Sequence, residues 1–185
     1  MERQKAGFDY QEQVIQKYNL QPDNNYTGHW DAYYRGVPVS IKLEKYHSDI
    51  EMADIFRQSQ ITEDFYLICG FWQGNPQNVI EEHLLFISAR EYSSYFNSAL
   101  LLDFQSLLKS ISNNYEDDEK WKRAITKYKK DWRRTTNNFI RPRFKRDHKQ
   151  QKRIQCAINN RDFYRHYLPK YEVIQLERNN QISRS

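Results

Sequence analysis

The chain has 185 residues, a formal net charge of +5, and a high content of both charged (29%) and aromatic (15%) residues. No apolar run approaches the roughly 20 residues that a helix needs to span a bilayer, and the first residues lead into no apolar secretion signal. We therefore expect neither a membrane protein nor a secreted one. The two cysteines, Cys69 and Cys156, lack the spacing of a metal site or a disulfide framework, which favours a reduced, cytoplasmic setting. The positive charge favours a polyanionic partner.

The N-terminal part of the chain is predicted to form a helix and then a β-hairpin. Residues 8–19 carry apolar side chains at helical spacing, and Pro22 follows in a turn-forming stretch that ends the helix. Residues 26–45 then form two strand-like arms that meet at Arg35 and Gly36, where we expect the turn.

A crossover and a buried strand are predicted next. Residues 48–60 are expected to form a second helix, because Ser48 and Glu51 match a capping box. The near-continuous apolar run at 65–72 predicts a strand buried on both faces, and a further strand is expected at 83–87. This order of elements predicts an α/β (α+β) fold with a mixed sheet flanked by helices.

The composition changes after about residue 98. An amphipathic helix at 99–109 precedes a strongly basic stretch, residues 120–170, in which aromatic side chains are interleaved. We therefore predict a core at 1–98 and a basic, helical region at 99–185 that packs on it. A stretch of charged residues usually forms no more than a solvent-exposed surface. Here the large excess of positive charge over residues 120–170 predicts that the region binds the phosphates of DNA. The predicted DNA-binding residues are Arg133, Arg134, Arg141, Arg143, Lys145, Arg146, Lys149, Lys152 and Arg153.

The hairpin carries side chains with the chemistry of a hydrolytic site. Side chains alternate between the faces of a strand, so Ser40, Lys42 and Glu44 share one face of the second arm. Asp31 on the first arm can approach them, and an acid beside a lysine can hold a metal ion and a water. The same two side chains also occur as a plain cross-strand ion pair. Asp31 followed by Ser40-Ile41-Lys42 resembles the motif of the PD-(D/E)XK nuclease superfamily.

This resemblance implies a restriction-endonuclease-like core and a sequence-specific, Mg²⁺-dependent endonuclease that hydrolyses the phosphodiester bonds of double-stranded DNA, often as a homodimer. It implies that Asp31 binds the metal, that Lys42 positions or activates the attacking water, and that Glu12 on the first helix joins the metal site. Ser40 stands where the family usually has a second acid, and a hydroxyl is a poor ligand for Mg²⁺. The carboxylates that can replace that acid in metal binding or catalysis are Glu44, Glu51 and Asp54.

Two other interpretations of these residues stay open. Glu51 can equally serve as the capping-box partner of Ser48. The missing acid is also compatible with a catalytically inactive nuclease-fold protein that only binds DNA, and the basic region with an RNA-binding protein whose hairpin lysine is merely exposed.

Overall fold

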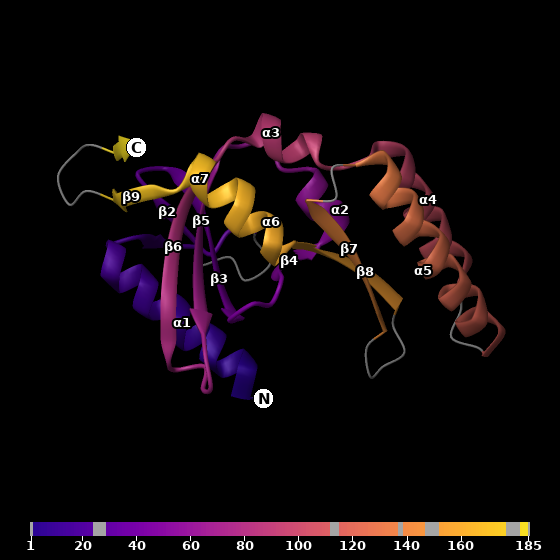
Figure 1. The fold of residues 1–185 in the computed structure, drawn as a ribbon, viewed down its shortest axis with the longest axis horizontal. Helices are drawn as coiled ribbons and strands as arrows, with labels where there is room; N and C mark the ends of the chain where they lie inside the picture. Colours follow the sequence, from indigo (N-terminus) through magenta and orange to yellow (C-terminus); the bar gives the residue numbers. More distant parts are fainter. Residues whose placement is uncertain are drawn as a thin grey trace. The chain divides into compact units, whose positions relative to one another are not determined.

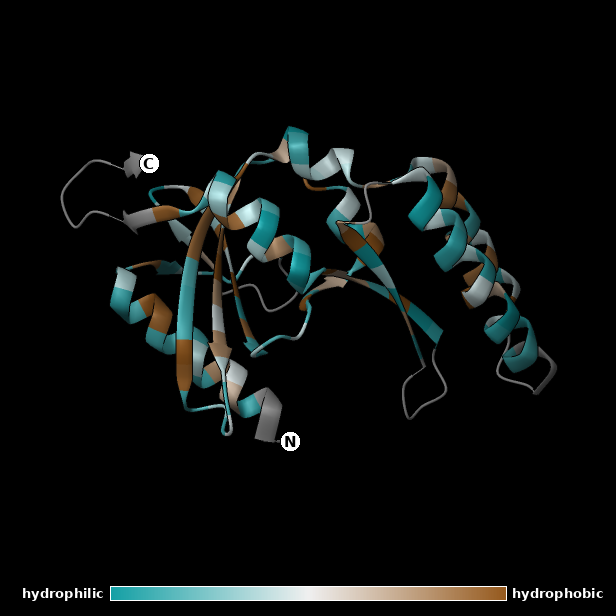
Figure 2. Ribbon diagram, in the orientation of Figure 1, coloured by the Kyte–Doolittle hydropathy of each residue, from teal (hydrophilic) through white to brown (hydrophobic). Residues whose placement is uncertain are grey.

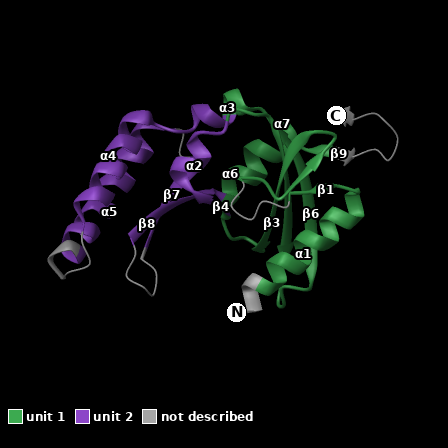
Figure 3. Ribbon diagram, turned by 180° about the vertical axis from the view of Figure 1, so that it is seen from behind, with its two compact units in different colours: residues 1–50, 62–91, 160–185 green, residues 51–61, 92–159 purple. Residues whose placement is uncertain are grey.

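The computed structural model describes residues 2–23, 29–111, 115–136, 139–146, 152–176 and 182–184. It has the predicted mixed α/β character, with parallel and antiparallel strands and flanking helices (Figure 1). The chain forms two compact units (Figure 3): unit 1 comprises residues 1–50, 62–91 and 160–185, and unit 2 comprises residues 51–61 and 92–159. Both units are therefore discontinuous in sequence, whereas the predicted division was a single boundary at residue 98. None of the helices in the described ranges combines the length and apolar character that crossing a membrane requires.

Unit 1 is built on a five-stranded sheet of order β1-β2-β3-β5-β6. The strands are β1 (Gln21–Pro22), β2 (Ala32–Tyr34), β3 (Val37–Lys45), β5 (Phe65–Trp72) and β6 (Val79–Ile87). The β2–β3 hairpin turns at Arg35 and Gly36, as predicted, and both have positive φ (53° and 79°), the combination that joins two twisted strands in a tight turn. β5 pairs parallel to β3 and antiparallel to β6, which makes the sheet mixed.

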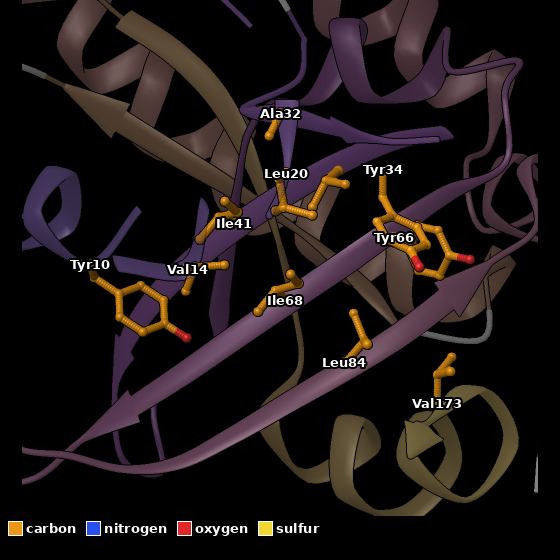
Figure 4. Close-up of a cluster of buried hydrophobic side chains, with 11 residues drawn as sticks. Tyr10, Val14, Leu20, Ala32, Tyr34, Ile41, Tyr66, Ile68, Leu84 and Val173 are labelled. Atoms are coloured by element: carbon orange, nitrogen blue, oxygen red, sulfur yellow. The ribbon is translucent and has the colours of Figure 1, made fainter. Parts of the chain in front are cut away.

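Helix α1 (Glu2–Tyr18) covers one face of this sheet and begins earlier than the predicted residue 8. Tyr10 and Val14 on α1 pack against the sheet residues Ile41 and Ile68 in the main hydrophobic cluster of the unit (Figure 4). The ring of Tyr10 lies directly over Gly70, and a Cβ atom at that position would overlap it. The absence of a side chain at Gly70 therefore sets how closely α1 approaches β5.

A polar contact at the edge of this cluster also ties α1 to β6. The carboxylate of Glu82 accepts hydrogen bonds from Tyr10 Oη (2.9 Å), Tyr18 Oη (2.6 Å) and Lys17 Nζ (2.6 Å). Burial by itself would raise the pKa of Glu82, but these three donors outweigh it and hold the pKa below its usual value.

The opposite face of the sheet is covered by α6 (Asn160–Asp162), the π-helical turn η1 (Phe163–Tyr167) and α7 (Leu168–Tyr171). The strands β9 (Val173–Leu176) and β10 (Ile182–Arg184) follow and pair with each other. Glu172 bridges to Leu85 of β6, and Val173 joins the hydrophobic cluster on the α1 side. Phe163 is fully buried and contacts Phe71 on β5 and His83 on β6, with ring centroids 5.7 and 5.9 Å away. β5 is consequently buried on both faces, as its apolar sequence predicted, and it is coloured largely hydrophobic in Figure 2.

Unit 2 combines a three-stranded sheet of order β4-β8-β7 with helices. Its elements are β4 (Ile50–Asp54), α2 (Ile55–Ser59), α4 (Ser98–Ser110), α5 (Tyr115–Thr135), β7 (Ile140–Arg146) and β8 (Lys152–Ile158), and α3 (Ala89–Ser94) leads into it from unit 1. Trp132 on α5 is fully buried, stacks on Phe104 of α4, and donates from Nε1 to the carbonyl of Ile140 at 2.6 Å. Phe144 on β7 meets Phe104 and Trp121 edge-on, so aromatic side chains make much of this core.

Two predicted helical segments are wrong. Residues 50–54 form strand β4, and Ser48 donates to the carbonyl of Lys45 instead of capping a helix. Buried Ile50 and Met52 alternate with more exposed residues, which is the period of a strand. Residues 140–146 and 152–158 also form strands, although we predicted a helical region there, because apolar and basic residues alternate along β7.

Candidate functional site

Asp31 and Lys42 come together at the open end of the β2–β3 hairpin. The register pairs Ala32 with Val39, and Asp31 N donates to the carbonyl of Val39 at 3.0 Å, so the ladder extends to Asp31. The carboxylate oxygen Oδ2 of Asp31 lies 3.2 Å from Lys42 Nζ. It also accepts a hydrogen bond from Ile41 N at 2.7 Å, which fixes the carboxylate against the backbone of β3. The predicted convergence of these two residues is therefore present.

Ser40 completes this local network. It is buried, and its hydroxyl lies 3.4 Å from the same Asp31 oxygen. The side chains of Lys42 and Asp31 are 22% and 25% exposed, so a ligand from solvent can reach the ion pair. Oδ1, the other carboxylate oxygen of Asp31, has no hydrogen-bond donor within the described part of the chain.

These residues can hold Mg²⁺ only as an incomplete site. Within the described ranges, no three His, Cys, Asp or Glu side chains gather closely enough to hold a metal ion. Mg²⁺ keeps several water ligands and is commonly bound by one or two carboxylates together with substrate phosphates. Asp31 can supply one such carboxylate through Oδ1. The donors present therefore fit a cation that the substrate helps to hold, rather than one caged by the protein.

The other two candidate acids of unit 1 lie differently. Glu44 is two residues beyond Lys42, half-buried, and on the same face of β3. Glu12 is exposed on α1, which packs on the face that carries Val39 and Ile41, opposite to the face of Lys42. Glu44 is therefore the carboxylate that β3 itself presents beside Lys42.

Glu51 and Asp54 belong to unit 2, where each has a partner of its own. Glu51 on β4 forms an ion pair with Lys145 at 2.9 Å and approaches Arg143 at 3.9 Å. Asp54 is the N-cap of α2, and its Oδ1 accepts from the backbone nitrogens of Phe56 and Arg57 at 3.0 Å each. α2 is therefore capped by Asp54 and not by the predicted capping box of Ser48 and Glu51, since Glu51 lies in strand β4.

The predicted DNA-binding residues are spread over several elements of unit 2. Arg133 and Arg134 are exposed in the last turn of α5, and Arg153 is exposed on β8. Lys152 differs from them, because its side chain is only 3% exposed and pairs with Asp118 at 3.1 Å. Lys149 lies outside the described residues, and for Arg146 only the backbone is described. Arg141, Arg143 and Lys145 alternate with apolar residues along β7.

A polar cluster that the sequence analysis missed lies on the face of unit 1 that carries Lys42. His83 Nδ1 contacts Glu172 at 2.8 Å and His83 Nε2 contacts Glu81 at 3.2 Å, while Tyr164 donates to Glu81 at 2.7 Å. Burial would raise the pKa of Glu81, but hydrogen bonds from Tyr164, His83 and Tyr46 outweigh it and lower the pKa. Glu81 and His83 are two residues apart on a strand, so the sequence could have predicted that their side chains share a face. No local pattern predicts that Glu172 joins them.

Cys69 lies next to Lys42 in the parallel register of β3 and β5. It is fully buried, and burial raises the pKa of its thiol well above the usual value. A thiol held in this protonated form is a poor nucleophile, so Cys69 belongs to the core rather than to the chemistry of the site.

Comparisons with protein-family models, with curated proteins and with solved structures gave no match for this chain.

Proposed function

We propose that the protein hydrolyses phosphodiester bonds of double-stranded DNA, with Asp31 and Lys42 at the reacting centre. The observation that carries the proposal is the 3.2 Å approach of Lys42 Nζ to Asp31 Oδ2 on neighbouring arms of one hairpin. The order of a helix, the hairpin, a crossover with a short helix and a strand parallel to β3 supports it, because the PD-(D/E)XK resemblance implies the same order. The short helix of that crossover, α2, belongs to unit 2.

Each residue of the pair has a definite task in this reaction. Asp31 binds Mg²⁺ together with the substrate phosphate; the ion, when bound, neutralises phosphate charge and activates a water. Lys42 places its positive charge beside the attacking water and the phosphate, where negative charge develops. Ile41 N keeps the carboxylate of Asp31 aimed at this position. The oxygen of the attacking water bonds to phosphorus, one P–O ester bond breaks, and the leaving oxygen takes up a proton that balances the one lost by the water.

The proposal assigns the place of a second acid to Glu44. It shares the strand and the face of Lys42, and Ser40, the motif position, offers only a buried hydroxyl that is directed to Asp31. Glu44→Gln is therefore expected to lower cleavage, while Glu12→Gln on the opposite side of the sheet should not.

We further propose a cytoplasmic protein, in which the two free cysteines stay reduced, and a homodimer that cuts one strand at each site.

A DNA-binding protein without catalysis is the second candidate. The hydrogen bonds that Asp31 Oδ2 accepts favour this candidate. Lys42, Ser40 and Ile41 N all donate to that oxygen and already compensate its charge without a metal ion. Under this candidate the ion pair only stabilises the end of the hairpin.

A cleavage assay separates the two candidates. Supercoiled and linear plasmid DNA are incubated with the wild type, Lys42→Ala and Lys45→Ala in Mg²⁺ or Mn²⁺, where Lys45 is an exposed lysine of the same strand and serves as the control. Metal-dependent products that Lys42→Ala loses and Lys45→Ala keeps support the nuclease. DNA retention without cleavage in either metal supports the binding protein. Preferential retention of RNA contradicts both.

A further inference from the structure

The three-stranded sheet of unit 2 has two chemically opposite faces. Side chains alternate along paired strands, and the register of β7 with β8 decides which ones share a face. One face carries buried Ile140 and Pro142, together with Phe144, opposite Ile158, Cys156 and Ile154 on β8. Phe144 meets Phe104 and Trp121 there, so this face belongs to the aromatic core.

The other face, which we call the basic face, carries Arg141, Arg143 and Lys145 of β7, paired in register with Ala157, Gln155 and Arg153 of β8. Arg153 is exposed, and the side chains of Arg143 and Lys145 are 39% and 36% exposed. Four cations therefore line two adjacent strands. They lie on a sheet whose reverse side packs against aromatic side chains.

One acid lies among these cations. Glu51 of β4 reaches Lys145 through Oε2 at 2.9 Å and Arg143 through Oε1 at 3.9 Å. These two contacts place the carboxylate of Glu51 on the basic face. A carboxylate between two basic side chains occupies the position that a phosphate would take in a complex with a polyanion.

We propose that the basic face binds duplex DNA as a β-ribbon, and that Glu51 is an internal counter-charge that a DNA phosphate displaces. The choice of DNA as the polyanion rests on the proposed function. Alternate residues of a strand are about 6.8 Å apart, which matches two base-pair steps of about 3.4 Å. The major groove of B-DNA admits a two-stranded β-ribbon, whereas the major groove of A-form RNA is too narrow for side chains to read.

Glu51 makes the proposal testable by a gain of binding. Glu51→Gln keeps the shape of the side chain but removes the negative charge that contacts Lys145 and Arg143. We expect duplex DNA to bind roughly two- to fivefold more tightly, which is the size of an exposed ion pair. The slope of log Kd against log salt concentration should become steeper by about one phosphate contact.

A paired loss-of-charge experiment locates the surface. The double variant Arg143→Gln/Arg153→Gln removes two cations from the basic face, and Lys109→Gln/Lys129→Gln removes two exposed cations from α4 and α5 as the matched control. The first should bind DNA at least tenfold more weakly, with a salt slope shallower by about two contacts, while the control changes little. Thermal unfolding checks that all variants are folded.

Binding is measured by fluorescence anisotropy with the full chain and a fluorescein-labelled 24-base-pair duplex in EDTA, so that cleavage plays no part. Tighter binding by Glu51→Gln together with weaker binding by the arginine double variant supports the proposal. Unchanged binding by Glu51→Gln, an equal loss in the control, or tighter binding of an RNA duplex would overturn it. Failure of the proposed hydrolysis is seen separately, as a lack of metal-dependent products from a protein that still binds DNA.

Discussion

Glu82 offers a direct test of what holds α1 on the sheet of unit 1. Its side chain is 17% exposed and accepts from two tyrosine hydroxyls and from Lys17. A hydrogen bond to a charged group contributes roughly 1.5–3 kcal/mol, whereas the exposed Lys17 pair adds little. Replacing Glu82 with Gln keeps the shape and one acceptor oxygen, so we expect a loss of about 1–2 kcal/mol at pH 7. For a chain of this length, that lowers Tm by roughly 2–8 °C.

The loss should also depend on pH in one direction. The pKa of Glu82 is lowered in the folded state, so the stabilisation is fully present above the unfolded value of about 4.3 and disappears as the pH falls through the folded pKa. The difference in unfolding free energy between wild type and Glu82→Gln should therefore be largest at pH 7 and shrink towards pH 3.

Urea unfolding followed by circular dichroism at both pH values measures these quantities. Glu12→Gln is the control, because Glu12 is an exposed acid on α1, the helix that Glu82 of β6 holds. Equal stability of Glu82→Gln and wild type at pH 7, or a difference that persists undiminished at pH 3, would refute the reasoning that a charged acceptor anchors α1.

Two further predictions concern unit 1 and the cysteines. Gly70→Ala is expected to destabilise the protein by about 1–3 kcal/mol, because the added Cβ overlaps the buried ring of Tyr10 and must displace that ring from its packing; an unchanged urea midpoint would contradict this. Cys69 and Cys156 are fully buried, and burial raises the pKa of both thiols, so neither should react with a thiol-specific disulfide reagent at pH 8 until urea unfolds the chain. Rapid labelling of the native protein would show that its core opens.

Features encoded by local patterns were predictable from the sequence. The hairpin was found because Arg35 and Gly36 separate two strand-like arms, and β5 because eight consecutive residues suit burial on both sides. The Asp31–Lys42 pair followed, since a tight turn fixes which residues face each other across a hairpin.

Short segments and distant contacts were not predictable in the same way. Strand β4 has only five residues, and its apolar side chains run on into those of α2, so strand and helix spacing could not be separated. The His83 cluster joins residues 89 positions apart, Glu172 included, and no local pattern encodes such a contact. Glu51 was considered as a metal ligand because it is an acid near the motif, and only tertiary structure reveals Lys145 as its partner.

The way the chain is shared between the two units has a consequence for biosynthesis. The sheet of unit 1 is complete once β6 has been made, but Phe163 and the segment around it, which cover Phe71 on the second face, are encoded after the whole of unit 2. A ribosome that has finished β6 must therefore make about 70 more residues before that apolar face can be covered. During that interval the apolar face that contains Phe71 is accessible to proteases and chaperones. In a truncated product that ends within unit 2, this face is never covered.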